Sequence, residues 1–318
     1  MTDTITLAQL SDVHLAPLRG LALRHLNVKR GLGYINWQRN RRHVHRRPSL
    51  DLVVADLKAH RPDHIAVTGD LINLGLPAEY EAARVWLESL GSPQTVTVIP
   101  GNHDIYTHVR GHPGIGRWSE FMRADAWGAE VKPQSADGFP FVRRIGPVAL
   151  ICLNSAEKTP PFVAAGRLGE RQIAALADLL ERTHREGLVR VVLIHHPPLP
   201  GQAPARRALR DAAALESVLA EHGAELVLHG HNHRDNHVDF AWGEGRIPVI
   251  GVASGSVGRV HKGEPLGRYN LLHIKRSESG AHIECITRGL DASGRIVEQV
   301  DRKSFVSGSI DPRAFAAP

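Results

Sequence analysis

Five short strings of the sequence are rich in aspartate, asparagine and histidine. They are Asp12-Val13-His14, Gly69-Asp70, Gly101-Asn102-His103-Asp104, His195-His196 and Gly230-His231-Asn232-His233. Carboxylate, amide and imidazole donors without a thiolate suit borderline or hard ions such as Mn, Fe or Zn. Seven side chains of this kind are too many for one ion and suitable for two, and they are Asp12, His14, Asp70, Asn102, His195, His231 and His233. In such a pair a shared carboxylate would bridge the ions, and Asp70 is the natural candidate.

Each string directly follows a strand-like run of apolar and β-branched residues. These runs lie at residues 5–10, 64–68, 95–99, 189–194 and 225–228. On its own, each string is equally well explained as a polar turn, because Asn, Asp and Gly favour turns. Several strands that end in such groups indicate a common site, since chemistry is often placed at the carboxyl edge of a sheet. Asp12 and His14 are two residues apart, so in an extended segment their side chains would point to the same side.

Helices and further strands separate and follow these runs. Helices are predicted at residues 77–90, 118–127, 168–185 and 211–222, and a strand pair at 139–144 and 148–153. Four more strand-like runs follow at residues 247–252, 269–274, 282–287 and 296–300. The alternation predicts an α/β fold in a single domain over residues 1–303. The tail at residues 304–318 is rich in Ser, Gly, Ala and Pro, and we expect it to be loosely held.

An insertion of different composition occupies residues 17–48. It holds nine lysines and arginines, no acidic residue, and interleaved Leu, Tyr, Ile and Trp residues. This basic amphipathic segment, which we expect to be partly helical, could cover a site for an anionic substrate. It could equally lie on an anionic membrane surface, or be a solvated lid packed by its own apolar residues. Non-specific nucleic-acid binding is the less favoured alternative, because no nucleic-acid-binding motif is present.

Composition excludes several classes of protein. The chain has 318 residues, 42% of them hydrophobic, and a formal net charge of +6. A globular protein with anionic partners is therefore expected. No apolar run approaches the ~20 residues of a membrane helix, the first residues do not resemble a signal peptide, and the two cysteines suggest no disulfide framework. We expect a cytoplasmic protein, with peripheral attachment to the inner membrane surface as an option.

The five strings, in this order, resemble the calcineurin-like metallophosphoesterase family. The family pattern is Asp-x-His, Gly-Asp, Gly-Asn-His-(Asp/Glu), His and Gly-His-x-His, and every motif is intact between about residues 5 and 235. The resemblance implies a four-layer αββα sandwich of two mixed β-sheets flanked by helices. It also implies that the last strands complete the second sheet and do not form a separate domain.

The resemblance also assigns roles to the residues of the strings. It places Asp12, His14, Asp70 and His233 on one ion, and Asp70, Asn102, His195 and His231 on the other. His103 is then a catalytic imidazole that faces the substrate. His196 and His229 are neighbours of ligands, and Asp104 either orients His103 or caps the next turn, which is the role we favour. Candidate substrate contacts are Arg19, Asn73 and His196.

The implied chemistry is hydrolysis of a phosphate ester. Two ions can bind a bridging water and lower its pKa, which gives a hydroxide for in-line attack on phosphorus. The motif variants most resemble class III cyclic nucleotide phosphodiesterases and related glycerophosphodiesterases, so a phosphodiesterase is the first hypothesis. The second is a pyrophosphatase or phosphatase on a lipid- or nucleotide-linked substrate, similar to UDP-diacylglucosamine pyrophosphatases, which the insertion supports. The third is an inactive metal-binding interaction module, against which the intact His103 and complete ligand set argue.

Overall fold

The fold is built from two six-stranded sheets in a computed structural model, which describes residues 4–18, 20–22, 25–107, 111–132, 138–243, 245–277 and 280–307. The first sheet has the order β12-β11-β10-β1-β2-β3. Its strands are β1 (Thr4–Leu10), β2 (His64–Val67), β3 (Val96–Val98), β10 (Arg268–Ser277), β11 (Gly280–Leu290) and β12 (Val297–Ser307). β1, β2 and β3 are parallel, whereas β10, β11 and β12 are antiparallel to their neighbours.

The second sheet has the order β4-β5-β6-β7-β9-β8. Its strands are β4 (Phe141–Ile145), β5 (Val148–Cys152), β6 (Val189–Leu193), β7 (Leu226–His229), β8 (Asn236–Trp242) and β9 (Gly245–Gly251). The central strands β5, β6, β7 and β9 are parallel, and the edge strands β4 and β8 are antiparallel. Both sheets are therefore mixed, as predicted.

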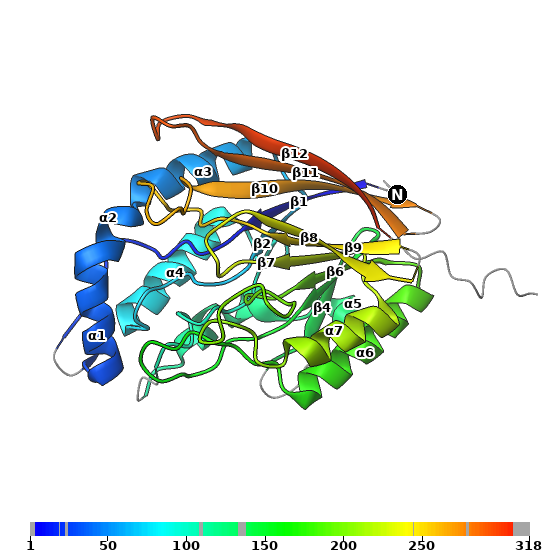
Figure 1. Cartoon of the computed structure of the whole chain (residues 1–318), viewed down its shortest axis with the longest axis horizontal. Coiled ribbons are helices and arrows are strands. Elements are labelled where there is room, and N and C mark those ends of the chain that lie inside the picture. The colour runs from blue at the N-terminus through cyan, green and yellow to red at the C-terminus, as the bar shows by residue number, and fades with distance from the viewer. Residues whose placement is uncertain are drawn as a thin grey trace, which may run out of the picture.

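Helices cover the outer faces of the sheets, and the first helix of the chain stands at one end of the sandwich (Figure 1). Their bounds, with a π-helical segment η2 and a 3-10 segment η3, are α1 (Val28–Asn36), η2 (Trp37–Arg41), α2 (Arg42–Val44), α3 (Arg47–Ala59), α4 (Pro77–Leu90), η3 (Gly114–Met122), α5 (Ala126–Val131), α6 (Glu170–Arg185) and α7 (Ala212–His222). α3 contacts β10, β11 and β12, whereas α6 contacts β5 and β6 of the second sheet. The four-layer αββα sandwich is confirmed.

Alternation along β6 shows how the layers are held together. Val191 and Leu193 belong to the core between the two sheets. Val192 and Ile194 belong to the core beneath α6 and α7. Because successive strand side chains point to opposite faces, a continuous apolar run covers both faces of a central parallel strand. Residues 191–194 therefore have no polar face, whereas the preceding Arg190 is buried in an ion pair with Glu225.

Three sequence predictions about the fold were wrong. β10, β11 and β12 extend the first sheet through β1, so only β8 and β9 complete the second sheet. The helix predicted at residues 118–127 is divided, because η3 ends at Met122 and α5 begins at Ala126 after the N-cap Asp125. Residues 304–307, which were predicted to belong to the tail, form part of β12, because β12 pairs with β11 as far as Ser307. The rest of the predicted tail lies outside the described residues.

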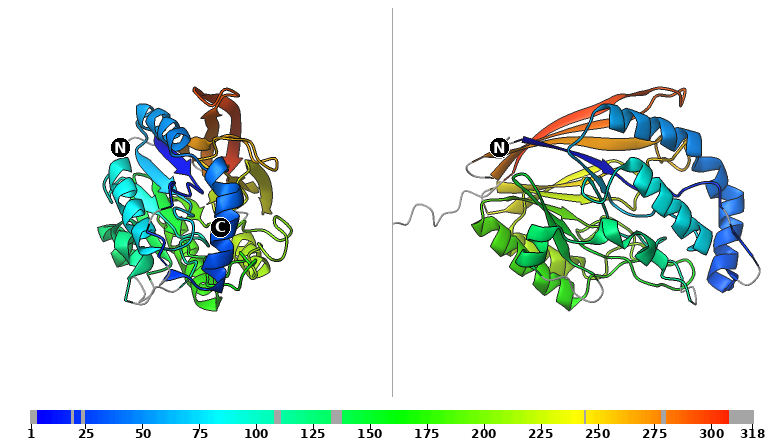
Figure 2. Two further views of the ribbon diagram at one scale, coloured as in Figure 1. Left: turned by 90° about the vertical axis from the view of Figure 1, so that its left-hand side faces the viewer. Right: turned by 180° about the vertical axis from the view of Figure 1, so that it is seen from behind.

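The insertion stands across one end of the sandwich. Figure 2 shows α1 upright at that end, beyond the carboxyl end of β1. Arg30 anchors the helix, because its buried guanidinium donates to the carbonyls of His25, Leu74 and Gly75 at 2.9, 3.1 and 2.7 Å. The predicted partly helical insertion is thus fixed beside the strand ends that carry the five strings. Among the described residues, no helix is long and apolar enough to cross a membrane.

Candidate metal centre

The strand ends bring all seven predicted ligands into one buried cluster. β1, β2 and β3 lead into Asp12 and His14, Asp70 and Asn102, while β6 and β7 lead into His195 and into the pair His231 and His233. All seven residues are buried, and the most exposed of them, His233, is 8% exposed. Two sheets and five separate segments must therefore fold before this cluster exists.

Five of the seven predicted ligands have left-handed backbone conformations, which direct their side chains into the cluster. Asp12, His14 and Asp70 have φ values of 52°, 38° and 57°, and His231 and His233 have values of 71° and 53°. Positive φ is uncommon outside glycine, although Asp and His tolerate it better than most residues. The expectation that Asp12 and His14 lie in an extended segment was wrong. They reach the same site because the chain turns at each of them.

The first ligand group contains Asp12, His14 and His233. Nε2 of His233 lies 3.2 Å from Nε2 of His14 and 3.3 Å from Oδ1 of Asp12. The other ring nitrogens are engaged, with Nδ1 of His14 at 3.1 Å from the carbonyl of Ile72 and Nδ1 of His233 at 3.1 Å from Glu264. Two Nε2 lone pairs at this separation would repel each other, so a proton or a cation belongs between them.

The second ligand group contains Asn102, His195 and His231. Nε2 of His195 lies 3.3 Å from Oδ1 of Asn102 and 3.2 Å from Nδ1 of His231. Nδ1 of His195 lies 2.7 Å from the carbonyl of Thr68, which fixes the proton on Nδ1 and the lone pair on Nε2. Nε2 of His195, Oδ1 of Asn102 and, in the tautomer of His231 protonated on Nε2, Nδ1 of His231 can therefore converge on one ion.

Asp70 joins the two groups. Its Oδ2 lies 3.8 Å from Nε2 of His14 and 3.6 Å from Nε2 of His195. Its Oδ1 accepts the backbone N–H of His103 at 2.8 Å, which holds the carboxylate in this orientation. Oδ2 is thus the atom available to both groups, as expected for a bridging carboxylate.

Two features show that these residues fit a pair of cations. In the described part of the chain, Oδ1 of Asp12 is buried and accepts no well-directed hydrogen bond, although His233 lies close to it. A buried carboxylate oxygen without a donor is costly unless a cation neutralises it. The donor set of imidazole, carboxylate and amide atoms also lacks any competing lysine or thiolate.

Burial and neighbouring charges shift the pKa values in the cluster. Burial lowers the pKa of His14 well below its usual range, and Arg41 lowers it further. Burial also lowers the pKa of His233, but the carboxylates of Asp12 and Glu264 outweigh it and raise this pKa to about 9. The row from Asp12 through His233 to Glu264 therefore binds a proton strongly, and a metal cation at Nε2 would replace that proton.

His103 lies beside the cluster and contributes no donor atom to either ligand group. Its Nδ1 lies 2.6 Å from the carbonyl of Asn73, and its ring stacks on Tyr106 with centroids 5.5 Å apart. Burial, with Arg41 as the second cause, lowers the pKa of His103 well below its usual range. Among the described residues, Nε2 has no hydrogen-bond partner, so it is the nitrogen available to a substrate.

Asp104 organises the turns that carry the ligands. Its buried carboxylate accepts the backbone N–H groups of Gly101, Asp70, Leu71 and Ile72 at 2.8–3.2 Å. Among the described residues, no hydrogen bond joins the Asp104 carboxylate to the side chain of His103 or of a predicted ligand. This is the structural role that we favoured for Asp104, and it ties the turn after β2 to the turn after β3.

The candidate substrate contacts have different positions. Arg19 lies outside the described residues. Asn73 is 1% exposed and donates from its side chain to the carbonyl of Leu15, so its place is that of a support for His103. His196 is fully buried with Nδ1 2.8 Å from Ser155 and Nε2 3.1 Å from the carbonyl of Ala164. This candidate was wrong, because neither ring nitrogen of His196 is left for a substrate.

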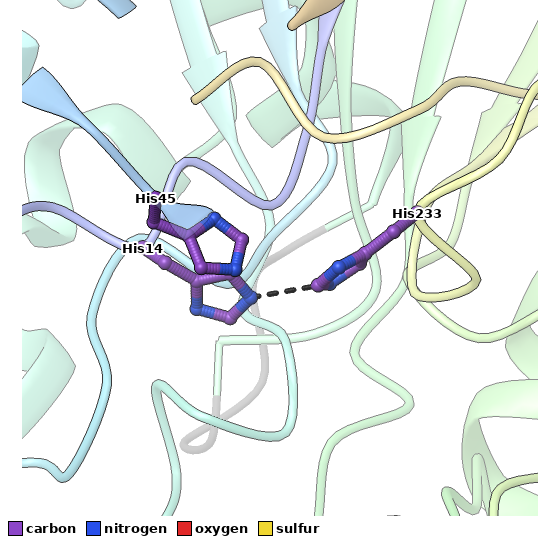
Figure 3. A group of neighbouring side chains, drawn as sticks. All are labelled: His14, His45 and His233. Atoms are coloured by element: carbon purple, nitrogen blue, oxygen red, sulfur yellow. Dashed lines mark hydrogen bonds between the residues drawn. The ribbon is translucent and has the colours of Figure 1, made fainter. Parts of the chain in front are cut away.

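Three residues at the site were missed in the sequence. Arg41 ends the π-helical segment η2, and its Nη1 lies 3.4 Å from Nδ1 of both His14 and His103. His45 lies beside His14 and His233 (Figure 3), and Glu264 contacts His233. The basic composition of the insertion was the only signal for Arg41. Nothing in the sequence distinguished His45 from the other histidines of the insertion.

Comparison with known proteins identifies the family. The family model for calcineurin-like phosphoesterases matches residues 5–235. The chain belongs to this family. The predicted resemblance is therefore confirmed, and the chain is a metal-dependent phosphoester hydrolase.

Two similar curated proteins carry phosphodiesterase names. One, described as a probable cyclic nucleotide phosphodiesterase of Synechococcus sp., is 28% identical over 254 residues, which are 78% of this chain and 79% of the relative. The other is a cAMP/cGMP dual specificity phosphodiesterase of Mycobacterium tuberculosis, 28% identical over 184 residues, which are 57% of this chain and 51% of the relative.

Two solved structures share the fold. A dimetal phosphatase from Danio rerio superposes with a TM-score of 0.60 at 14% identity, covering 96% of this chain and 99% of that protein. A purple acid phosphatase from yellow lupin superposes with a TM-score of 0.58 at 12% identity, covering 98% of this chain and 55% of that protein. At these identities the likeness establishes the two-sheet architecture alone.

Proposed function

We propose that this phosphoesterase is a two-ion phosphodiesterase. The observation that carries the proposal is the position of Asp70, whose Oδ2 lies 3.8 Å from a ligand atom of one group and 3.6 Å from a ligand atom of the other. When bound, a pair of ions supplies an activated water as nucleophile and neutralises charge on the phosphoryl group. Mn, Fe and Zn all accept these donors, and we favour Mn or Fe.

His103 is the proposed proton donor to the leaving oxygen. Its Nδ1–H is held by the carbonyl of Asn73 at 2.6 Å, so the proton that is transferred must be on Nε2. Burial lowers the pKa of His103, which disfavours the doubly protonated ring in the absence of a substrate. A phosphodiester anion beside the ring would raise that pKa, because an adjacent negative charge stabilises imidazolium. Substrate binding would thus favour the doubly protonated form of His103, which is the form that can donate a proton to the leaving oxygen.

We predict that His103→Ala lowers kcat by roughly two to four orders of magnitude, the range typical of a general acid or base. Both ions should remain, because no ligand atom is removed. The measurement is kcat with Mn added, together with metal content by plasma mass spectrometry. A variant that loses an ion with its activity would show that His103 is a ligand and not an acid.

Arg41 is the proposed cation for the phosphoryl oxygens. Its half-buried side chain lies next to His103, and the described residues include no carboxylate within ion-pair distance of it. A guanidinium without a protein carboxylate can form charge-assisted hydrogen bonds to two phosphoryl oxygens. The insertion would in this way complete the substrate site.

A diester is the favoured substrate, because two relatives have cyclic nucleotide phosphodiesterase names. The test is hydrolysis of bis-p-nitrophenyl phosphate, p-nitrophenyl phosphate and cyclic AMP by the protein reconstituted with Mn. We expect hydrolysis of the diesters. Hydrolysis of the monoester alone would contradict the proposal, and inactivity towards every ester with both ions bound would favour an interaction module.

The exposed face of α1 supports a second candidate, a pyrophosphatase or phosphatase that acts on a lipid- or nucleotide-linked substrate at an anionic membrane surface. Val28, Leu32 and Ile35 are 75%, 37% and 47% exposed. Their spacing of four and three residues places them on one face of the helix. The nearby side chains of Arg39 and Arg42 are exposed as well. An apolar face flanked by cations is typical of a helix that lies in a membrane interface.

Sedimentation with vesicles tests this candidate. The unmodified protein should bind vesicles that contain phosphatidylglycerol and should not bind pure phosphatidylcholine vesicles. Joint replacement of Val28, Leu32 and Ile35 by serine should abolish binding, whereas Val85→Ser, which removes a valine that is 56% exposed on α4, should not. No binding by the unmodified protein would contradict membrane attachment.

A further inference from the structure

His45 is buried against the first ligand group although it belongs to no family motif. The residue is 4% exposed and lies between α2 and α3, at the end of the insertion. Its ring centroid is 4.7 Å from that of His14 and 5.5 Å from that of His233. One ring nitrogen of each of the three histidines lies within 4.8 Å of the others. Figure 3 shows the three rings gathered at one point.

Backbone pairing fixes His45 in this position. His45 forms an antiparallel bridge with Val257. The N–H of Arg46 donates to the carbonyl of Ser256 at 2.8 Å, and the N–H of Gly258 donates to the carbonyl of Val44 at 2.8 Å. The imidazole is therefore held by the segment after β9 and not by the insertion alone.

Two serine hydroxyl groups lie beside Nδ1 of His45 and indicate its tautomer. The hydroxyl of Ser254 donates to the carbonyl of Asp12 at 2.6 Å. The hydroxyl oxygen of Ser256 lies 3.4 Å from the hydroxyl oxygen of Ser254. Nδ1 of His45 lies 2.8 Å from the Ser256 hydroxyl. We assign the ring proton to Nδ1, because the Ser256 oxygen can then accept from it while the Ser256 hydroxyl proton points toward Ser254. The remaining lone pair is on Nε2, which has no hydrogen-bond partner among the described residues. A lone pair offers nothing to a phosphoryl oxygen, which is itself an acceptor, but it can bind a cation.

We propose that His45 is an additional metal ligand, which adds its Nε2 to the ion held by Asp12, His14, Asp70 and His233. The inference rests on the proposed two-ion centre. It makes the two ions unequal, because the first has three imidazole ligands and the second has two, from His195 and His231. The first ion is then the more tightly held, and the second keeps the open positions that a substrate needs.

Titration of Mn into the metal-free full chain tests the proposal. Binding to unmodified protein, His45→Ala, His45→Gln and the exposed neighbour Arg46→Ala is followed by electron paramagnetic resonance. We expect both His45 variants to weaken one of two sites by about 10- to 100-fold, as loss of a metal-site partner typically does. The other site and the Arg46→Ala protein should remain within about twofold. Unchanged Mn affinities in both His45 variants would overturn the proposal, even if turnover fell.

A measurement on the unmodified chain covers the case in which a variant does not fold. Pulsed resonance of the Mn-loaded protein with 15N-labelled histidine counts the imidazole nitrogens at each ion. Three at one ion and two at the other are expected, whereas two at each would overturn the role of His45. Binding of fewer than two ions by the unmodified chain would instead contradict the proposed function, so the two failures are distinguishable.

Discussion

Replacing Asp104 by asparagine removes half of the acceptors that hold the ligand turns. Oδ1 accepts from Leu71 and Ile72, while Oδ2 accepts from Asp70 and Gly101. An asparagine keeps one oxygen and turns an NH2 group toward the other two N–H donors. At ~1–3 kcal/mol for each buried donor left without an acceptor, Asp104→Asn should cost ~2–6 kcal/mol. That is a large share of the ~5–15 kcal/mol that stabilises a typical domain.

Urea unfolding of the metal-free protein measures this loss as a change in the free energy of unfolding. Asp63→Asn is the matched control, because the exposed carboxylate of Asp63 accepts only one backbone N–H, from Thr6 at 2.8 Å, among the described residues. We expect the control to lose less than ~1 kcal/mol, since water can replace an exposed acceptor. A loss at Asp104 no larger than that at Asp63 would refute the role assigned to this carboxylate.

Two further predictions concern the substrate cation and the proton at the metal centre. Arg41→Ala should raise KM for a diester by roughly tenfold or more, since loss of a charge-assisted contact costs ~1.5–3 kcal/mol. The control Arg39→Ala removes an exposed arginine and should leave KM within about twofold. Steady-state kinetics of the two variants measure both values of KM. With its pKa raised to about 9, His233 is protonated in the metal-free protein at pH 7–8, and binding of an ion to its Nε2 must release that proton. Apparent Mn affinity should therefore rise about tenfold per pH unit up to about pH 9 and level off above it. Calorimetry in buffers of different ionisation enthalpy should detect the released proton. A Mn affinity that does not depend on pH would contradict this account.

The ligand cluster could be predicted because its residues lie in strings that directly follow strands. Asp70 and His195 were found in this way, each after a largely apolar run that is buried throughout. Burial of parallel strands on both faces makes such runs conspicuous, and strand ends at one sheet edge are close in space whatever the loops between them do.

The remaining features depend on tertiary contacts that no local pattern encodes. His45 reaches the site through pairing with Val257, more than two hundred residues away along the chain. Arg41 is placed by the π-helical turn of η2, which the spacing of basic residues does not predict. Alternation in β10 equally allows either sheet, and its antiparallel pairing with β1 decided the outcome. The left-handed turns at Asp12 and His14 were missed because neither residue is glycine.

Anomalous diffraction at the Mn absorption edge, from crystals of the Mn-loaded protein, tests the two-ion centre most directly. The account predicts two anomalous peaks, one beside Asp12, His14 and His233 and the other beside Asn102, His195 and His231, with Oδ2 of Asp70 in contact with both. A single peak, or two peaks that do not share Asp70, would contradict it.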